Sequence, residues 1–127
     1  MIDHVSIPVR DLQAAAAFYD AVLRPLGMAR LVTREATVGY GKQYPEFWLN
    51  LRPEVAPASN PGAHIGLRAP DADAVRAFHA AALALGAADD GAPGERQGTM
   101  TAYFGAFIID ADGNKLEVLT FVRPPAG

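Results

Sequence analysis

Two histidines and one glutamate are the residues of this chain best suited to chemistry, because the sequence contains no cysteine. His4 and His64 lie 60 positions apart, and Glu117 lies near the C-terminal end. Two imidazoles and a carboxylate suit a divalent first-row metal ion and leave coordination positions open for water or substrate. Taken singly, each residue is more typical of a surface or hydrogen-bonded side chain. A metal site therefore requires a relation between them.

An internal repeat relates the two histidines. A shift of 60 residues superposes positions 4–23 on positions 64–83 with seven identities. Three of the identities are alanines, and the other four are His4/His64, Asp11/Asp71, Phe18/Phe78 and Leu23/Leu83. Self-similarity at a fixed period is typical of a duplicated structural unit. The alternative is two unrelated amphipathic helices, each preceded by a strand.

Each copy of the repeat predicts a strand followed by a helix. Apolar residues alternate with other residues over positions 4–9, and this two-residue period favours a strand with one buried face. Asp11 can then cap a helix that ends at Gly27. The second copy offers Asp71 and Gly86 at the corresponding places.

Extended segments follow each predicted helix. They are 29–34, 37–41 and 46–51 in the first copy, and 87–90, 101–109 and 115–122 in the second. The sequence therefore predicts an α+β fold of two βαβββ modules, over about residues 1–52 and 63–123, joined by a proline-bearing linker at 53–62. Because half of the 127 residues are hydrophobic, the whole chain is expected to form one domain, residues 1–127.

Side-chain alternation along the strands predicts which residues share a face. His4, His64 and Glu117 fall opposite the apolar residues that should pack against the helices. Further residues on this parity, or close to it, are candidates for substrate contact: Trp48, Asn50, Tyr103 and Phe107. Aromatic residues in strands more often belong to the core, so that alternative stays open for them.

Two runs of residues resemble the start and the end of vicinal oxygen chelate proteins. The first is His4-Val-Ser-Ile-Pro-Val-Arg-Asp-Leu, with Ala17-Phe-Tyr-Asp and Leu26-Gly27. The second is Gly105-Ala-Phe-Ile-Ile-Asp-Ala-Asp-Gly-Asn-Lys-Leu-Glu117-Val. This superfamily includes glyoxalases, extradiol dioxygenases, fosfomycin-modifying enzymes and bleomycin-binding proteins. The resemblance covers almost the whole chain and is more specific for the fold than for an activity.

The resemblance implies a curved, cup-shaped mixed sheet with the helices on the outside. It implies that His4, His64 and Glu117 hold a divalent ion (Fe, Mn, Ni or Zn) in the cup. Such an ion would chelate adjacent oxygens of a small substrate and act as a Lewis acid. Glu117 is also the candidate catalytic residue, as a proton shuttle. A homodimer is expected, since small members of the superfamily often pair.

Departures from the best-known members leave the activity open. Glyoxalases usually add a carboxylate ligand from the last strand of the first module, where this chain has Trp48 and Asn50, with Glu46 a weak candidate. Extradiol dioxygenases need another acid/base histidine, whereas His79 is expected to be a surface or packing residue on a helix. We expect a metal-dependent lyase, isomerase or dioxygenase. The alternative is a non-catalytic antibiotic- or metabolite-binding protein of the bleomycin-resistance type.

Two polar segments have their own interpretations. Residues 92–100 favour a solvated loop or, in a metal enzyme, a lid from which Arg96 reaches an anionic substrate. Asp112-Gly113 predicts a hairpin turn. A calcium loop is excluded because its glycine and its final glutamate would be wrongly spaced.

Charge and hydropathy restrict the partners. The net charge is −3 and no basic cluster occurs, which argues against a nucleic-acid partner. The first residues carry charge and lack the features of a secretion signal. No stretch approaches the roughly 18 apolar residues of a membrane span. We expect a cytoplasmic protein that binds a small molecule.

Overall fold

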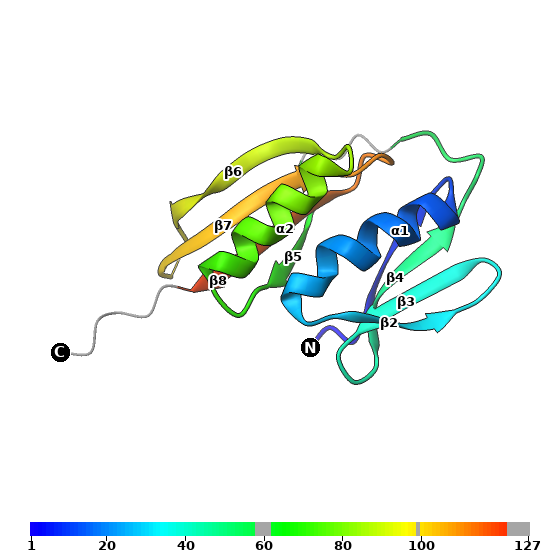
Figure 1. The fold of residues 1–127 in the computed structure, drawn as a ribbon, viewed down its shortest axis with the longest axis horizontal. Coiled ribbons are helices and arrows are strands. Elements are labelled where there is room, and N and C mark those ends of the chain that lie inside the picture. Colours follow the sequence, from blue (N-terminus) through cyan, green and yellow to red (C-terminus); the bar gives the residue numbers. More distant parts are fainter. Residues whose placement is uncertain (58–61, 99, 122–127) are drawn as a thin grey trace.

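The computed structural model describes residues 1–57, 62–98 and 100–121, and it contains the same order of elements twice (Figure 1). Module one comprises β1 (Val5–Val9), α1 (Leu12–Leu23), the 3-10 helix η1 (Arg24–Leu26), β2 (Ala29–Thr33), β3 (Thr37–Gly41) and β4 (Pro45–Leu51). Module two comprises β5 (Ile65–Arg68), α2 (Ala72–Ala84), β6 (Ala88–Gln97), β7 (Ala102–Ile109) and β8 (Lys115–Phe121). The predicted two-module α+β fold is confirmed.

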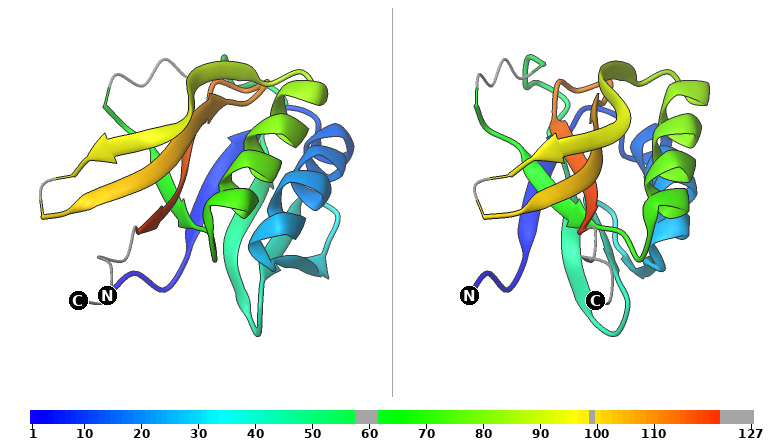
Figure 2. Two further views of the ribbon diagram at one scale, coloured as in Figure 1. Left: turned by 60° about the vertical axis from the view of Figure 1, so that its left-hand side comes forward. Right: turned by 90° about the vertical axis from the view of Figure 1, so that its left-hand side faces the viewer.

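The strands form two four-stranded mixed sheets, one in each module. Their orders are β1-β4-β3-β2 and β5-β8-β7-β6, and the first and last strands of each module run parallel. Both helices lie on one side of the strands and contact each other (Figure 2). Among the described residues, β1 and β5 each pair with a strand on one side only, so each is an edge strand.

One hydrophobic core joins the two modules. The helices bury stripes of side chains at helical spacing, which are Ala16, Tyr19, Val22 and Leu23 in α1 and Val75, Phe78 and Ala82 in α2. These stripes share a core with alternate strand residues such as Val9, Leu49 and Val118, all of them buried. The opposite faces of the sheets are left for other side chains.

The ends of the helices agree with their sequence signals. Asp11 and Asp71 each accept a hydrogen bond from the backbone N–H three residues later, at 3.0 and 2.8 Å. Gly27 and Gly86 have φ angles of 81° and 97°, in the left-handed region that favours glycine. Neither helix, nor any other within the described residues, is long and apolar enough to cross a membrane.

Strand β6 is much longer than predicted. The expected loop at 92–100 is wrong for residues 92–97, because β6 continues through them and pairs with β7. The pairing register shifts between Asp89 and Gly91 and again between Gly91 and Gly94. These bulges accommodate Pro93, which has no N–H to donate to a neighbouring strand. A loop was predicted because the segment is polar and contains proline and glycine. Residue 99 lies outside the described residues.

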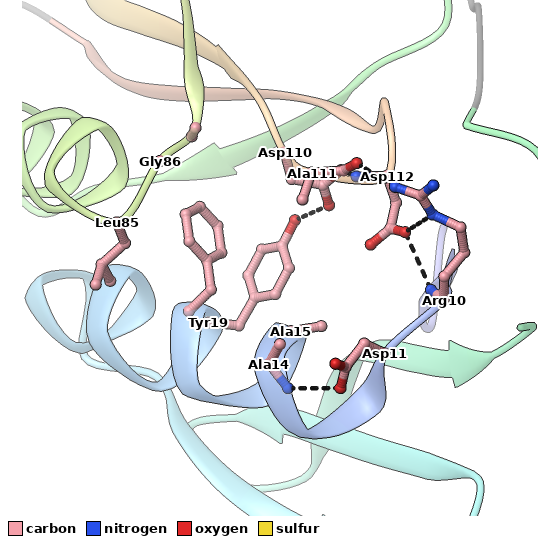
Figure 3. A pocket seen from close by; sticks show the side chains of 12 residues that line it. Arg10, Asp11, Ala14, Ala15, Tyr19, Leu85, Gly86, Asp110, Ala111 and Asp112 are labelled. Carbon is pink, nitrogen blue, oxygen red and sulfur yellow. Dashed lines mark hydrogen bonds and ion pairs between the residues drawn. The ribbon is translucent and has the colours of Figure 1, made fainter.

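The turn between β7 and β8 fastens module two to module one. Asp110 accepts a hydrogen bond from the Tyr19 hydroxyl at 2.6 Å, and both groups are buried (Figure 3). Asn114 donates to the Pro8 carbonyl at 3.0 Å. The turn itself is the predicted hairpin turn, with Gly113 at a φ of 82°. Contacts between residues about 100 positions apart thus depend on one short segment.

We predict that Tyr19→Phe lowers the free energy of unfolding by about 1.5–3 kcal/mol, because Asp110 loses a buried charge-assisted hydrogen bond. Urea denaturation followed by circular dichroism measures this change. The matched control is Tyr44→Phe, since Tyr44 is 54% exposed. Equal stability of Tyr19→Phe and the wild type would contradict the assigned role of the turn.

Candidate functional site

His64 and Glu117 come together on the face of module two that points away from the helices. His64 immediately precedes β5, and Glu117 lies on the neighbouring parallel strand β8 opposite Gly66. The His64 Nε2 and Glu117 Oε1 atoms are 3.1 Å apart. The side chain of His64 is 38% exposed and that of Glu117 is 11% exposed. An imidazole and a carboxylate therefore meet where a ligand can still approach.

Phe107 forms one wall beside this pair. It is the direct cross-strand neighbour of Glu117, and its ring centroid lies 5.8 Å from that of His64 in an edge-on arrangement. The Lys115 ammonium lies 4.8 Å from the same ring centroid and also forms an ion pair with Asp90 at 2.8 Å. The surroundings of the pair are therefore partly aromatic and partly cationic.

Tyr103 reaches toward Glu117 from β7. Its ring lies over Gly105, where an added Cβ would come within 3.0 Å of a ring carbon. Glycine at 105 thus leaves the space that the ring occupies. Burial raises the pKa of Tyr103, and the nearby carboxylate of Glu117 raises it further, so the hydroxyl keeps its proton and can donate it in a hydrogen bond.

Arg96 has a different place from the one expected. Instead of extending from a lid, its guanidinium donates to the backbone carbonyls of Ala92, Gly94 and Gly105. It also lies 5.4 Å from the ring centroid of Phe107. Arg96 therefore closes the bulges of β6 against β7, and it remains close to the residues around His64.

His4 lines a hollow on module one that His64 does not line. This hollow, of about 460 Å³, is also lined by Trp48 and Asn50. The Trp48 ring covers Gly39, where an added Cβ would approach ring atoms to 2.9 Å. The Arg34 guanidinium lies 5.7 Å from the ring centroid of Trp48. The hollow therefore combines a flat aromatic surface with a cation. The sequence analysis did not identify Arg34, because it lies between two strands, where side-chain alternation gives no information.

The three predicted ligands do not meet at one point within the chain. His4 and His64 line a common cleft of about 600 Å³, which Glu46 also lines. The side chain of His4 is 55% exposed, and its Nδ1 atom lies within hydrogen-bond distance of Asp3 Oδ1, at 2.7 Å. Over residues 1–57, 62–98 and 100–121, His, Asp and Glu side chains form no group of three that could hold a metal ion. Within one chain, two of the three predicted ligands, His64 and Glu117, are in contact.

His79 takes no part in these hollows. It is buried in α2, and its Nε2 atom lies 3.0 Å from Asp89 Oδ1. This contact lowers the pKa of Asp89. Of the two expected places, on the surface or in the packing, His79 occupies the second, and no acid/base role follows from it.

The two modules are equivalent in register but not in side chains. Ser6 of β1 lies opposite Trp48, as Gly66 of β5 lies opposite Glu117. Since residues 6 and 66 are related by the repeat, Trp48 occupies in module one the place of Glu117 in module two. Module one thus has an indole at the position where module two has a carboxylate.

Comparison with known proteins places this arrangement in context. The family model for the Glyoxalase/Bleomycin resistance protein/Dioxygenase superfamily matches residues 1–118. A glyoxalase/bleomycin resistance protein from Albidiferax ferrireducens T118 is 32% identical, with 92% of this chain and 96% of that chain covered and a TM-score of 0.82. No curated protein matches the chain.

More distant structures share the fold. A glyoxalase/bleomycin resistance protein/dioxygenase family enzyme from Burkholderia phytofirmans PsJN is 20% identical, covers 95% of this chain and 98% of its own, and has a TM-score of 0.73. The fosfomycin resistance protein FosX from Listeria monocytogenes is 14% identical, with 94% of this chain and 91% of that chain covered and a TM-score of 0.68. At these identities the likeness concerns the fold alone.

We predict that Glu117→Gln lowers the pKa of Tyr103, because removal of a neighbouring negative charge makes the phenolate easier to form. Titration of the Tyr103 ring carbon by NMR measures this pKa. Glu46→Gln, which changes an exposed carboxylate of module one, is the control and should leave it unchanged. The same Tyr103 pKa in Glu117→Gln and the wild type would show that the two side chains do not interact.

Proposed function

Because the chain belongs to the Glyoxalase/Bleomycin resistance protein/Dioxygenase superfamily, we propose that it binds a divalent metal ion and acts on a small substrate with two adjacent oxygens. The observation that carries this proposal is the 3.1 Å approach of His64 to Glu117 on a partly exposed sheet face. With His4 the donor set is two imidazole nitrogens and a carboxylate, which fits Fe, Mn, Ni or Zn.

We infer that His4 joins the other two ligands in a homodimer. Within one chain His4 and His64 line a common cleft, but among the described residues only His64 and Glu117 are in contact, and no group of three ligands forms. The strands that follow the histidines, β1 and β5, each pair on one side only within the described residues. Module one of one copy can therefore meet module two of a second copy, which would bring both ligand groups to one place.

The chain's own residues then have distinct roles around a substrate. A bound ion would supply Lewis-acid polarisation of the substrate oxygens. Trp48 offers a flat face to an apolar or aromatic part of the molecule, and Asn50 lines the same hollow. The Tyr103 hydroxyl donates a hydrogen bond to a substrate oxygen. The Glu117 oxygen that does not face His64 accepts a proton.

A second function is favoured by the position of His79. Because His79 is buried on the helix side, no histidine beyond the proposed ligands lies in the hollows. This scarcity of acid/base groups fits a protein that binds an antibiotic or metabolite without changing it. The hollow with Trp48 would then be the binding surface.

We predict that untagged protein carries about one Fe, Mn, Ni or Zn ion per chain, and that His64→Ala and Glu117→Gln lose it. Elemental analysis by mass spectrometry measures the metal content. His79→Gln is the control, since His79 lies away from the proposed ligands and should leave the content unchanged. Metal-free wild-type protein whose Trp48 fluorescence is quenched by aromatic compounds would favour binding without chemistry.

Mixing His4→Ala with His64→Ala tests where the third ligand comes from. If ligands come from two copies, a mixed dimer has one intact site, so an equal mixture recovers about a quarter of the sites. If the ligands come from one chain, no intact site forms and no metal binding returns after mixing. The latter result would contradict the shared site while leaving a metal site within each chain.

A further inference from the structure

A cavity of about 310 Å³ lies at the junction of the two modules (Figure 3). It shares no lining residue with the hollows that contain His4 and His64. Module one contributes the residues after β1 and one face of α1. Module two contributes the residues after α2 and the turn between β7 and β8. The cavity is therefore separate from the proposed metal site.

Most of the wall of this cavity is apolar. Ala14, Ala15 and Phe18 line it from successive turns of α1, and Leu85 lines it from the end of α2. Leu85 is 53% exposed. A small hydrocarbon or aromatic group placed here would cover apolar surface that the fold leaves open to water, which is favourable.

Three carboxylates line the polar end of the cavity, and in two of them, Asp11 and Asp112, the fold uses only one oxygen. Asp11 Oδ1 accepts from the backbone of Ala14 at 3.0 Å. Asp112 Oδ1 accepts from the backbone N and the Nε atom of Arg10 at 3.0 and 2.8 Å. No group in the described part of the chain donates to the second oxygen of either carboxylate. The side chain of Asp112 is only 12% exposed.

The charge around the cavity is negative. Asp11, Asp110 and Asp112 line it, and Arg10 is the only basic residue among its lining residues. The first turn of α1 adds a partial positive charge of about +0.5, which does not balance the carboxylates. A cation is therefore favoured at the polar end.

We propose that this cavity binds a small primary ammonium compound with an apolar tail. The nitrogen donates to the free oxygens of Asp11 and Asp112, and a third N–H remains for water. The tail lies against Phe18 and Leu85. This site goes beyond the proposed function and does not depend on a metal ion. Because both modules line the cavity, the bound compound raises the stability of the folded chain.

Calorimetric titration of the full chain with 2-phenylethylammonium tests this proposal. We expect it to bind about tenfold more tightly than the uncharged 2-phenylethanol, since its hydrogen bonds are made to charged groups. Backbone NMR signals of Ala14, Ala15 and Ala87 should shift on binding. No binding of the ammonium compound, or equal affinity for the alcohol, would overturn the proposal.

Two variants locate the binding. Asp11→Asn keeps an oxygen that can cap α1 but removes the charge, so the affinity should fall up to about fivefold. Ala14→Leu fills the cavity from an exposed helix position and should abolish binding. Asp73→Asn, which removes the charge of an exposed carboxylate that does not line the cavity, is the control and should bind normally. Thermal unfolding without ligand checks that each variant is folded. Unchanged affinity in both cavity variants, or lost affinity in the control, would refute the site.

Discussion

The carboxylate of Asp110 is the point on which the arrangement of this molecule depends. It is 8% exposed and accepts hydrogen bonds from the backbone of residues 112 and 114, from the amide of Asn114 and from the hydroxyl of Tyr19. A buried carboxylate is stable only when its oxygens are bonded in this way. The donors come from both modules. The same group therefore shapes the turn after β7 and fixes that turn against α1.

This fastening fixes the position of one module relative to the other. With the helices in contact and the turn bonded to module one, each sheet turns its free face away from the shared core. His4 and His64 line a common cleft, whereas Trp48 lies in the hollow of module one and Glu117 contacts His64 on module two. Among the described residues, β1 and β5 each pair with a strand on one side only. An unpaired strand edge needs to be covered or protected, and the proposed homodimer would do this.

Much of this fold could be predicted because the repeat and the strand parity are local signals. The shift of 60 residues located both histidines, and parity selected Trp48 and Glu117 for the faces away from the helices. Parity cannot tell how two sheets are oriented to each other, so the separation of His4 from Glu117 was not predictable. The second part of β6, residues 91–97, was missed because its bulges break the two-residue period. The cavity between the modules depends on distant contacts and has no sequence signal.

The exchange of Trp48 for Glu117 between equivalent positions bears on how such a molecule can evolve. Each module also adjusts the neighbouring strand, with Gly39 beside the indole and Phe107 beside the carboxylate. Each pair of neighbouring strands thus carries one large aromatic side chain. In module one it is Trp48 on β4, and in module two it is Phe107 on β7. The two modules therefore differ at two neighbouring, equivalent positions. A substitution around Trp48 would change what module one can contact and would leave the His64–Glu117 pair of module two in place.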